Sequence, residues 1–158
     1  MMTALDPQDL DLISALARDG RATVVSLSEE LGLSRNTVQT RMAKLERAGA
    51  LPAYERALSP RTLGFPIEAY LAVTVHQQQL PGITESLLTI PEIVQVHGLS
   101  GPVDLLVRVA CRDAAHLFEV DARILSVEGV ERTETSIVMG EVIGYRTRPL
   151  MELARSDR

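Results

Sequence analysis

The sequence predicts an α+β protein in two parts: an N-terminal three-helix (winged) helix-turn-helix, followed by a ferredoxin-like βαββαβ ligand-sensing domain. Residues 1–50 contain three apolar patterns of helical period, each with helix start and stop signals. Residues 66–145 alternate between strand-like and helix-like segments. Between them, residues 51–65 are expected to form a linker strand, and residues 146–158 a loosely ordered C-terminal tail.

Residue types that are typical of helix termini predict the first two helices. Asp6 followed by Pro7 is typical of a helix start, because the carboxylate can accept a free backbone N–H and proline needs no donor there. Gly20 ends this helix. The second helix begins after Thr23 and ends at Gly32, since glycine adopts a positive φ most readily at a helix C-terminus.

A third helix, capped by Ser34 and running to about Ala48, completes the helix-turn-helix pattern. Val38, Met42 and Leu45 fall on one side and are expected to face the other helices. The other side is polar, and such a side can contact base edges and phosphates. The candidate DNA-binding residues are Ser34, Arg35, Asn36, Thr37, Thr40, Arg41, Lys44 and Arg47. The alternative is the solvated face of an ordinary three-helix domain.

The charge distribution favours the DNA-binding interpretation. The net charge of the chain is −5, which by itself argues against nucleic acid as a partner. Between Ser34 and Arg47, however, four basic side chains stand against one acidic side chain. Positive charge is therefore concentrated where a DNA-contacting helix is expected to lie.

The second part is predicted to be a βαββαβ domain. Its expected elements are a strand over Ile67–His76, a helix over Leu80–Ile90, strands over Ile93–Leu99 and Leu105–Cys111, a helix over Ala114–Val127 and a strand over Val130–Val142. Right-handed crossovers place both helices on one face of the sheet. The other face also carries apolar residues, so we expect it to be covered by a second copy in a symmetric dimer.

Composition excludes several classes. A single cysteine, Cys111, allows no disulfide within the chain, which fits a reducing compartment. No apolar run reaches the roughly 18 residues of a membrane span, and no signal pattern is present, so we expect a cytoplasmic protein without a membrane partner. There is neither a His/Cys cluster at metal spacing nor a Gly-rich phosphate loop followed by Lys. We therefore expect no metal, no cofactor and no enzymatic activity.

Several short motifs in this order resemble the Lrp/AsnC (feast/famine) transcription regulators. They are Leu5-Asp6 with Asp9 and Asp11, Gly20-Arg21-Ala22, Gly32-Leu33-Ser34 with Val38, Arg41, Leu45-Glu46 and Gly49, Leu58-Ser59-Pro60 with Leu63-Gly64-Phe65-Pro66, and Gly101-Pro102-Val103-Asp104. The resemblance extends to about Tyr145. It implies a dimer that assembles into tetramers or octamers, binds double-stranded promoter DNA and responds to an amino acid.

The resemblance also implies an effector site near the Gly-x-x-Asp turn. Asp104 corresponds to the residue that receives the ligand's ammonium group, and Gly101 leaves backbone N–H groups accessible to a carboxylate. Further candidate contacts on the last strand are Thr133, Thr135 and Ser136. The alternative role for Asp104 is to stabilise the turn.

Two rival functions follow from the same layout. Tetrapyrrole (sirohaem-type) decarboxylases resemble it, and such an enzyme needs His or Arg side chains that converge on a haem-like substrate. The histidines here, His76, His97 and His116, are scattered along the chain. The other rival is an amino-acid sensor that does not bind DNA, which the basic third helix disfavours.

Overall fold

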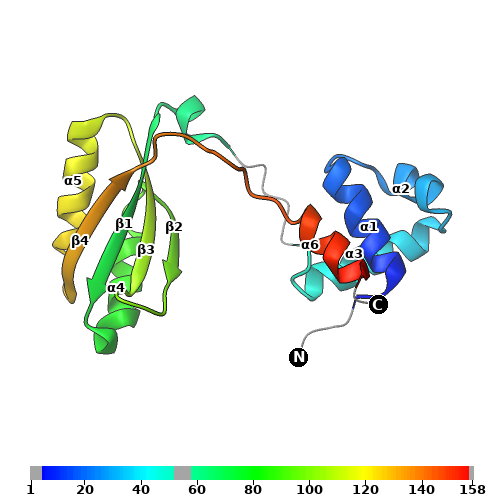
Figure 1. Cartoon of the computed structure of the whole chain (residues 1–158), viewed down its shortest axis with the longest axis horizontal. Coiled ribbons are helices and arrows are strands. Elements are labelled where there is room, and N and C mark those ends of the chain that lie inside the picture. The colour runs from blue at the N-terminus through cyan, green and yellow to red at the C-terminus, as the bar shows by residue number, and fades with distance from the viewer. Residues whose placement is uncertain (1–4, 52–57, 157–158) are drawn as a thin grey trace. The chain divides into compact units, whose positions relative to one another are not determined.

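The computed structural model describes residues 5–51 and 58–156 (Figure 1). The chain divides into two compact units. The first unit comprises Met1–Arg56 together with Ile143–Arg158, and the second comprises Ala57–Val142. The C-terminal segment therefore belongs to the same unit as the N-terminal helices.

The first unit begins with the three predicted helices, α1 (Pro7–Arg18), α2 (Val24–Leu31) and α3 (Arg35–Arg47). Their start signals act as predicted. Asp6 accepts the backbone N–H of Asp9 in a reciprocal capping box, and the Thr23 and Ser34 hydroxyls accept N–H groups of α2 and α3. Gly32 ends α2 with a φ of 64°, so the predicted left-handed turn between α2 and α3 is confirmed.

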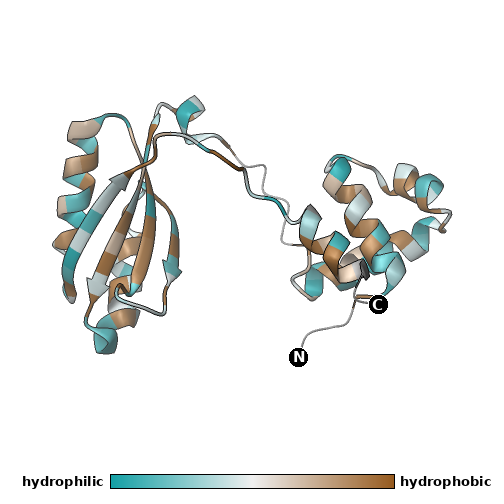
Figure 2. Cartoon of the chain, in the orientation of Figure 1, coloured by the Kyte–Doolittle hydropathy of each residue, from teal (hydrophilic) through white to brown (hydrophobic). Residues whose placement is uncertain are grey.

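Aliphatic side chains from all three helices form the core of this unit. Leu12, Leu27, Val38 and Leu45 are completely buried, and Met42 packs against them at the edge. In Figure 2, each of these helices carries both apolar and polar residues, as helices that bury only one face do. The predicted inward side of α3 is confirmed, which leaves its polar side facing outward.

The C-terminal tail differs from its prediction as a loosely ordered terminus. It contains a helix, α6 (Arg148–Ser156), which contacts α1. The physical reason is local: Pro149 suits the first helical turn, and the residues after it have high helix propensity. The prediction was wrong because it weighed the polar residues and overlooked the apolar ones, Leu150, Met151 and Leu153.

The second unit is the predicted ferredoxin-like domain. Its regular elements are β1 (Ile67–Val75), α4 (Leu80–Leu88), β2 (Ile93–Gly98), β3 (Leu105–Cys111), α5 (Ala114–Leu125) and β4 (Val130–Ile137), with short 3-10 turns η1 (Pro60–Leu63) and η2 (Gln77–Gln79). The four strands pair antiparallel in the order β2-β3-β1-β4. The predicted α+β fold is confirmed.

Both helices of this unit pack on one face of the sheet, as predicted. Alternate residues of β1 (Ala69, Leu71, Val73 and Val75) are buried in one cluster with Ile83 and Leu87 of α4 and Leu117, Val120 and Ile124 of α5. The opposite face, called the open face below, carries the intervening residues. By the strand register these include Glu68, Tyr70, Ala72, Leu106, Arg108 and Ser136.

Most element ends in this unit lie within two residues of their predictions, and two boundaries in and around it differ by more. The last strand, expected to run to Val142, ends at Ile137. Part of the expected linker strand, residues 52–57, lies outside the described residues. The part before β1 forms the turn η1 instead of a strand, because Pro60 donates no N–H and Gly64 adopts a φ of 90°.

Candidate DNA-binding and effector sites

The outward side of α3 forms an open depression. Its lining includes five of the candidate DNA-binding residues, so the structure brings most of that predicted set together. The volume is about 490 Å³, and the residues that line it are Asp6, Asn36, Thr37, Thr40, Arg41 and Lys44. Asn36 and Thr40 are exposed, and Thr37 is half-buried. Short polar groups on an exposed helix surface are chemically suited to contact base edges.

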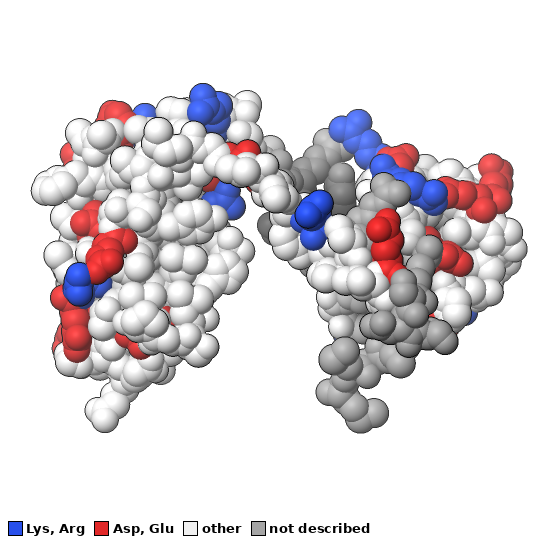
Figure 3. All heavy atoms as spheres, viewed as in Figure 1, with Lys and Arg blue, Asp and Glu red and all other residues white. Residues whose placement is uncertain are grey.

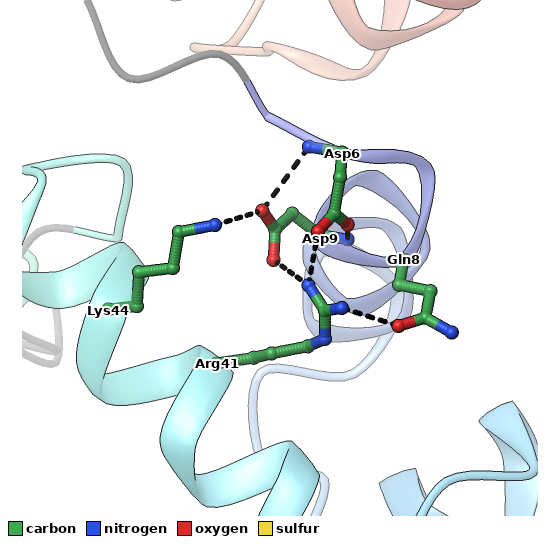
Figure 4. Close-up of polar contacts among 5 residues, drawn as sticks. All are labelled: Asp6, Gln8, Asp9, Arg41 and Lys44. Atoms are coloured by element: carbon green, nitrogen blue, oxygen red, sulfur yellow. Dashed lines mark hydrogen bonds and ion pairs between the residues drawn. The ribbon is translucent and has the colours of Figure 1, made fainter.

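Two basic residues in this depression are bound by carboxylates of α1 (Figure 4). Nη1 of Arg41 donates to Oδ1 of Asp9 and to Oδ2 of Asp6, each at 2.6 Å. Nη2 of Arg41 donates to Oε1 of Gln8 at 2.5 Å. Nζ of Lys44 lies 2.9 Å from Oδ2 of Asp9. This cluster is called the α1–α3 clamp below.

Asp9 is the centre of the clamp and is completely buried. Burial by itself raises the pKa of Asp9, but hydrogen bonds from Lys44 and Arg41 outweigh it and hold that pKa below its ordinary value. The hydrogen bond from Arg41 also lowers the pKa of Asp6, and the pKa of Arg41 is raised. Asp6, Asp9 and Arg41 are therefore charged at neutral pH, and the clamp joins α3 to α1 by buried and partly buried ion pairs.

Of the remaining candidates, Ser34 is the N-cap of α3, and Arg35 and Arg47 are exposed basic residues. Oγ of Ser34 accepts the N–H of Thr37 at 3.1 Å, and the two hydroxyls lie 2.8 Å apart. Arg35 and Arg47 are exposed and pair with no carboxylate in the part of the chain that the structure describes. Elsewhere on this unit, Figure 3 shows both acidic and basic side chains on the visible surface. Positive charge not matched by a carboxylate is thus held at the two ends of α3.

The clamp was missed by sequence reasoning. Asp6 and Asp9 were interpreted only as part of a helix start and a family motif, and Arg41 and Lys44 only as DNA contacts. The signal was present, because two acids within one turn of α1 face two bases within one turn of α3. Which pairs meet depends on how α1 and α3 pack, and that is a tertiary property.

The effector candidates Gly101 and Asp104 lie in the turn between β2 and β3. Gly101 is exposed, and no atom within 4 Å occupies the space beside it. Oδ2 of Asp104 accepts the backbone N–H of Val75 at 2.9 Å, and Oδ1 accepts the Gln77 amide at 2.5 Å. These two hydrogen bonds lower the pKa of Asp104, so its carboxylate is charged. Asp104 thus hydrogen-bonds the turn to the end of β1, which is what its alternative role of stabilising the turn requires.

The three candidates on β4 do not share a face. Register pairs Thr133 with Val73 and Thr135 with Leu71, on the face that α4 and α5 cover. The Thr135 hydroxyl donates to Oδ1 of Asp121 in α5 at 3.0 Å. Ser136 pairs with Tyr70 and belongs to the open face. Thr133 is the candidate nearest the turn, because the Val73 carbonyl accepts the N–H of Asp104.

The structure does not bring the three histidines together. His76 follows β1 and pairs with Glu131, His97 lies on β2, and His116 is buried at the start of α5. Nε2 of His116 contacts Oε1 of Glu92 at 2.9 Å, and Arg123 pairs with the same carboxylate. Cys111 is buried, and burial raises its pKa to about 11. His76 and His116 thus have carboxylate partners, and in the described chain the three histidines lie on different elements and do not converge.

In the described residues, no group of three or more His, Cys, Asp or Glu side chains is arranged to hold a metal ion. No helix among residues 5–51 and 58–156 is both long enough and apolar enough to cross a membrane.

Comparison with protein-family models identifies both units. The model described as the Lrp/AsnC ligand binding domain matches residues 68–147, which is half of the chain. The model described as winged helix-turn-helix DNA-binding matches residues 5–51. The chain belongs to the Lrp/AsnC family of transcriptional regulators. The predicted family and the predicted regulatory function are confirmed.

Relatives of this Lrp/AsnC regulator match along most of their length. The HTH-type transcriptional regulator FL11 of Pyrococcus horikoshii is 30% identical over 139 residues, covering 88% of this chain and 92% of that protein. The leucine-responsive regulatory protein of Haemophilus influenzae is 29% identical over 144 residues, covering 88% and 86%. The crystal structure of transcriptional regulator NMB0573 from Neisseria meningitidis in complex with L-Met has a TM-score of 0.81 at 28% identity, covering 95% and 99%. These proteins are regulators, so the comparisons give no support to the decarboxylase alternative.

Proposed function

We propose that this Lrp/AsnC regulator acts in the cytoplasm as a homodimer whose two α3 helices enter successive major grooves of promoter DNA. In this proposal Asn36, Thr37 and Thr40 contact base edges, and Arg35 and Arg47 contact phosphates. The observation that carries it is the polar, exposed side of α3, held on α1 by the fully buried Asp9. Half-sites lie about 10–10.5 base pairs apart, or a multiple of that.

Arg41 and Lys44 have a different role in this proposal from the one assigned to them from the sequence. Both are engaged by α1 carboxylates, so their first contribution is to orient α3. Arg41 is largely enclosed, with 21% of its side chain exposed, whereas Lys44 keeps 41% exposed. Lys44 can therefore lie beside a phosphate as well as pair with Asp9, and Arg41 acts mainly as a positioning residue.

The open face is the proposed dimer surface. It combines half-buried Tyr70, Ala72 and Leu106 with an ion pair between Glu68 and Arg108. The apolar residues favour burial, and the ion pair is satisfied within the chain, so stacking two such faces leaves no unpaired charge there. A twofold axis makes the same residues contact each other from both sides. Assembly of dimers into tetramers or octamers follows as the family's usual arrangement.

The proposed effector is an amino acid bound near the Gly101–Asp104 turn. Support comes from relatives, since one is named leucine-responsive and a neighbouring structure holds L-Met. A carboxylate has about four lone-pair sites, and Asp104 uses two of them within the chain. The others can accept an ammonium group, so the tie to β1 and ligand binding are compatible. Of the β4 candidates, Thr133 best fits this site.

Fluorescence anisotropy with labelled promoter DNA tests the DNA-binding part. Asn36→Ala and Thr40→Ala are expected to weaken binding to a specific site, with each lost base contact worth about 1–3 kcal/mol. Gln39→Ala is the matched control, because Gln39 is exposed on the same helix but does not line the depression. Equal affinities for all three variants and wild type contradict the proposal.

A further inference from the structure

Helix α5 carries two apolar sides that point in opposite directions. The side that packs on the sheet consists of its buried residues, His116, Leu117, Val120 and Ile124. The outward side is called the α5 stripe below, and it consists of Ala115, Phe118, Ala122 and Leu125. At about 100° per residue, these four fall within an arc of roughly 80° on the helix. A helix that is apolar on two opposite sides is typically covered on both.

Within its own unit, the α5 stripe has no cover. All four members are exposed, Phe118 to 75% and Leu125 to 45%. In Figure 1, α5 lies at the outside of the second unit, and no other described element of that unit lies beyond it. Contiguous apolar side chains at the surface mark a site where another molecule binds.

The spacing of the stripe indicates that its partner is a helix. Successive members are three, four and three residues apart. This is the a/d spacing by which one helix packs its side chains between those of another. The stripe extends over about 15 Å of helix, which is ten residues at 1.5 Å each.

The sizes of the side chains select a second copy of α5 as that helix. Consider two copies that run antiparallel about a twofold axis at the level of Val120, so that residues equally far from Val120 face each other. Phe118 then faces the partner's Ala122, and Ala115 faces the partner's Leu125. Every layer joins one large and one small side chain, which is how facing side chains fill a core without voids. A parallel pair instead places Phe118 against Phe118 and Ala122 against Ala122.

The charges beside the stripe agree with this arrangement. Glu119 and Arg123 lie on the same flank of α5, and in the antiparallel pair Glu119 comes within about 3 Å, along the axis, of the partner's Arg123. Glu119 is exposed and forms no ion pair within the described residues, and the side chain of Arg123 is 44% exposed beside its pair with Glu92. The acid nearest the axis, Asp121, is half-buried and accepts the Thr135 hydroxyl at 3.0 Å, so it is held against its own sheet.

We infer that the α5 stripe joins one dimer to another, by antiparallel packing of α5 on α5 about a twofold axis near Val120. The inference rests on the proposed open-face dimer, in which α5 stays free because it covers the other face of the sheet. Each dimer then presents two stripes, so a dimer can join two others. Two kinds of twofold contact build a closed ring of dimers when their axes meet.

Sedimentation of the full-length chain tests the contact. Wild type is expected to form assemblies larger than a dimer, and Phe118→Lys is expected to stop at the dimer, because two ammonium groups then enter each apolar seam. Phe118 is exposed in the single chain, so this variant keeps its fold. Leu88→Lys is the matched control and is expected to assemble like wild type, since Leu88 is 80% exposed on α4 and is not part of the stripe.

Exchanging the sizes tests the antiparallel pairing itself. Phe118→Ala is expected to raise the dissociation constant between dimers at least about tenfold, and Ala122→Phe is expected to weaken the contact by crowding two layers. The double variant Phe118→Ala/Ala122→Phe is expected to restore assembly, because each layer again joins a large and a small side chain. A double variant weaker than both single variants contradicts the pairing.

Cysteine cross-linking gives a second measurement of the same geometry. A mixture of Ala115→Cys and Leu125→Cys is expected to form a mixed disulfide under mild oxidation. Each variant alone is expected to form none, because identical positions lie about 15 Å apart along an antiparallel pair. Native Cys111 does not compete, since it is buried with a pKa of about 11. Disulfides within each single variant and none in the mixture contradict the antiparallel arrangement.

The sedimentation results also separate failure of this inference from failure of the proposed dimer. A wild-type protein that sediments as a dimer, or a larger assembly that Phe118→Lys leaves intact, overturns the α5 contact and leaves the open-face dimer standing. A wild-type monomer overturns both.

Discussion

Replacing Arg41 with Met tests the α1–α3 clamp most sharply. Met keeps an apolar stem of similar length and a similar helix propensity, so the variant removes the guanidinium with little other change. The substitution leaves Asp6 and Asp9 close together, with Lys44 as their remaining cation. We expect the DNA-binding unit to unfold more easily and α3 to lose its fixed orientation.

The magnitude follows from burial. Arg41 donates a charged hydrogen bond to Asp9, which is completely buried, and such a bond is worth about 1.5–3 kcal/mol. Breaking a fully buried pair costs about 3–5 kcal/mol, but Arg41 is partly exposed and Lys44 still pairs with Asp9, so the loss is smaller. The expected decrease in the free energy of unfolding is about 2 kcal/mol. For a unit of this size that lowers the melting temperature by about 10 °C.

Two assays together separate stability from DNA contact. Urea unfolding followed by circular dichroism measures the free energy, with exposed Arg35→Met as the control, expected to stay within about 0.5 kcal/mol of wild type. The salt dependence of DNA affinity then counts phosphate contacts. For Arg41→Met we expect a salt slope close to that of wild type, measured below the temperature at which the unit unfolds.

The opposite pair of results contradicts a stabilising role for the clamp. If Arg41→Met is as stable as wild type, and the salt slope falls by about one, Arg41 contacts a phosphate and the clamp is incidental.

Four further predictions follow from other sites. Arg47→Ala is expected to weaken binding to all DNA sequences and reduce the salt slope by about one in anisotropy titrations, and an unchanged slope shows that Arg47 touches no phosphate. Gly129→Ala is expected to destabilise the second unit by about 1–2 kcal/mol in thermal unfolding, because φ at Gly129 is +91° and an added Cβ meets the Gln79 side chain at 2.2 Å. Gly140→Ala is the control and is expected to be neutral, because the space around Gly140 is open. Burial raises the pKa of Glu92, but hydrogen bonds from Arg123 and His116 lower it to about 2. The contribution of Glu92 to stability is therefore complete above pH 4.5 and is lost as the pH falls toward 2. Glu92→Gln is expected to remove this part of the acid dependence of unfolding, and identical pH profiles of variant and wild type contradict the assignment. An amino acid effector at a hundredfold excess over its Kd is expected to add about 2.7 kcal/mol of stability in a thermal shift screen. We expect Asp104→Ala to lose this shift. If that variant keeps the shift, Asp104 stabilises the turn and does not bind the effector.

Much of the fold was predictable because its signals are local. Helix caps at Asp6, Thr23 and Ser34, and the positive φ at Gly32, depend on a few neighbouring residues, and each acts in the structure as its residue type suggests. Likewise, the order of strand and helix patterns after residue 66 was enough to predict the ferredoxin-like fold. The end of β4 was harder to predict, since the apolar residues that follow Val138 look like strand residues but pair with no strand within the described chain.

The candidate sites were less predictable, for two different reasons. The engagement of Arg41 by Asp9 depends on the packing of α1 against α3, which no local pattern reveals. The separation of Thr135 from Ser136 was accessible from the sequence, because successive strand residues point to opposite faces. Choosing both as contacts to one ligand overlooked that alternation.

DNA recognition by the exposed side of α3 is tested most directly by selection of bound sequences from a random DNA pool, carried out in parallel with the wild-type protein, Asn36→Ala and Gln39→Ala. We expect wild type and Gln39→Ala to enrich one pseudo-palindromic motif with half-sites about 10–10.5 base pairs apart or a multiple of that. We expect Asn36→Ala to relax the preference at defined positions in each half-site. Enrichment of no motif, or of an identical motif with wild type and Asn36→Ala, contradicts the claim that the exposed side of α3 contacts the bases.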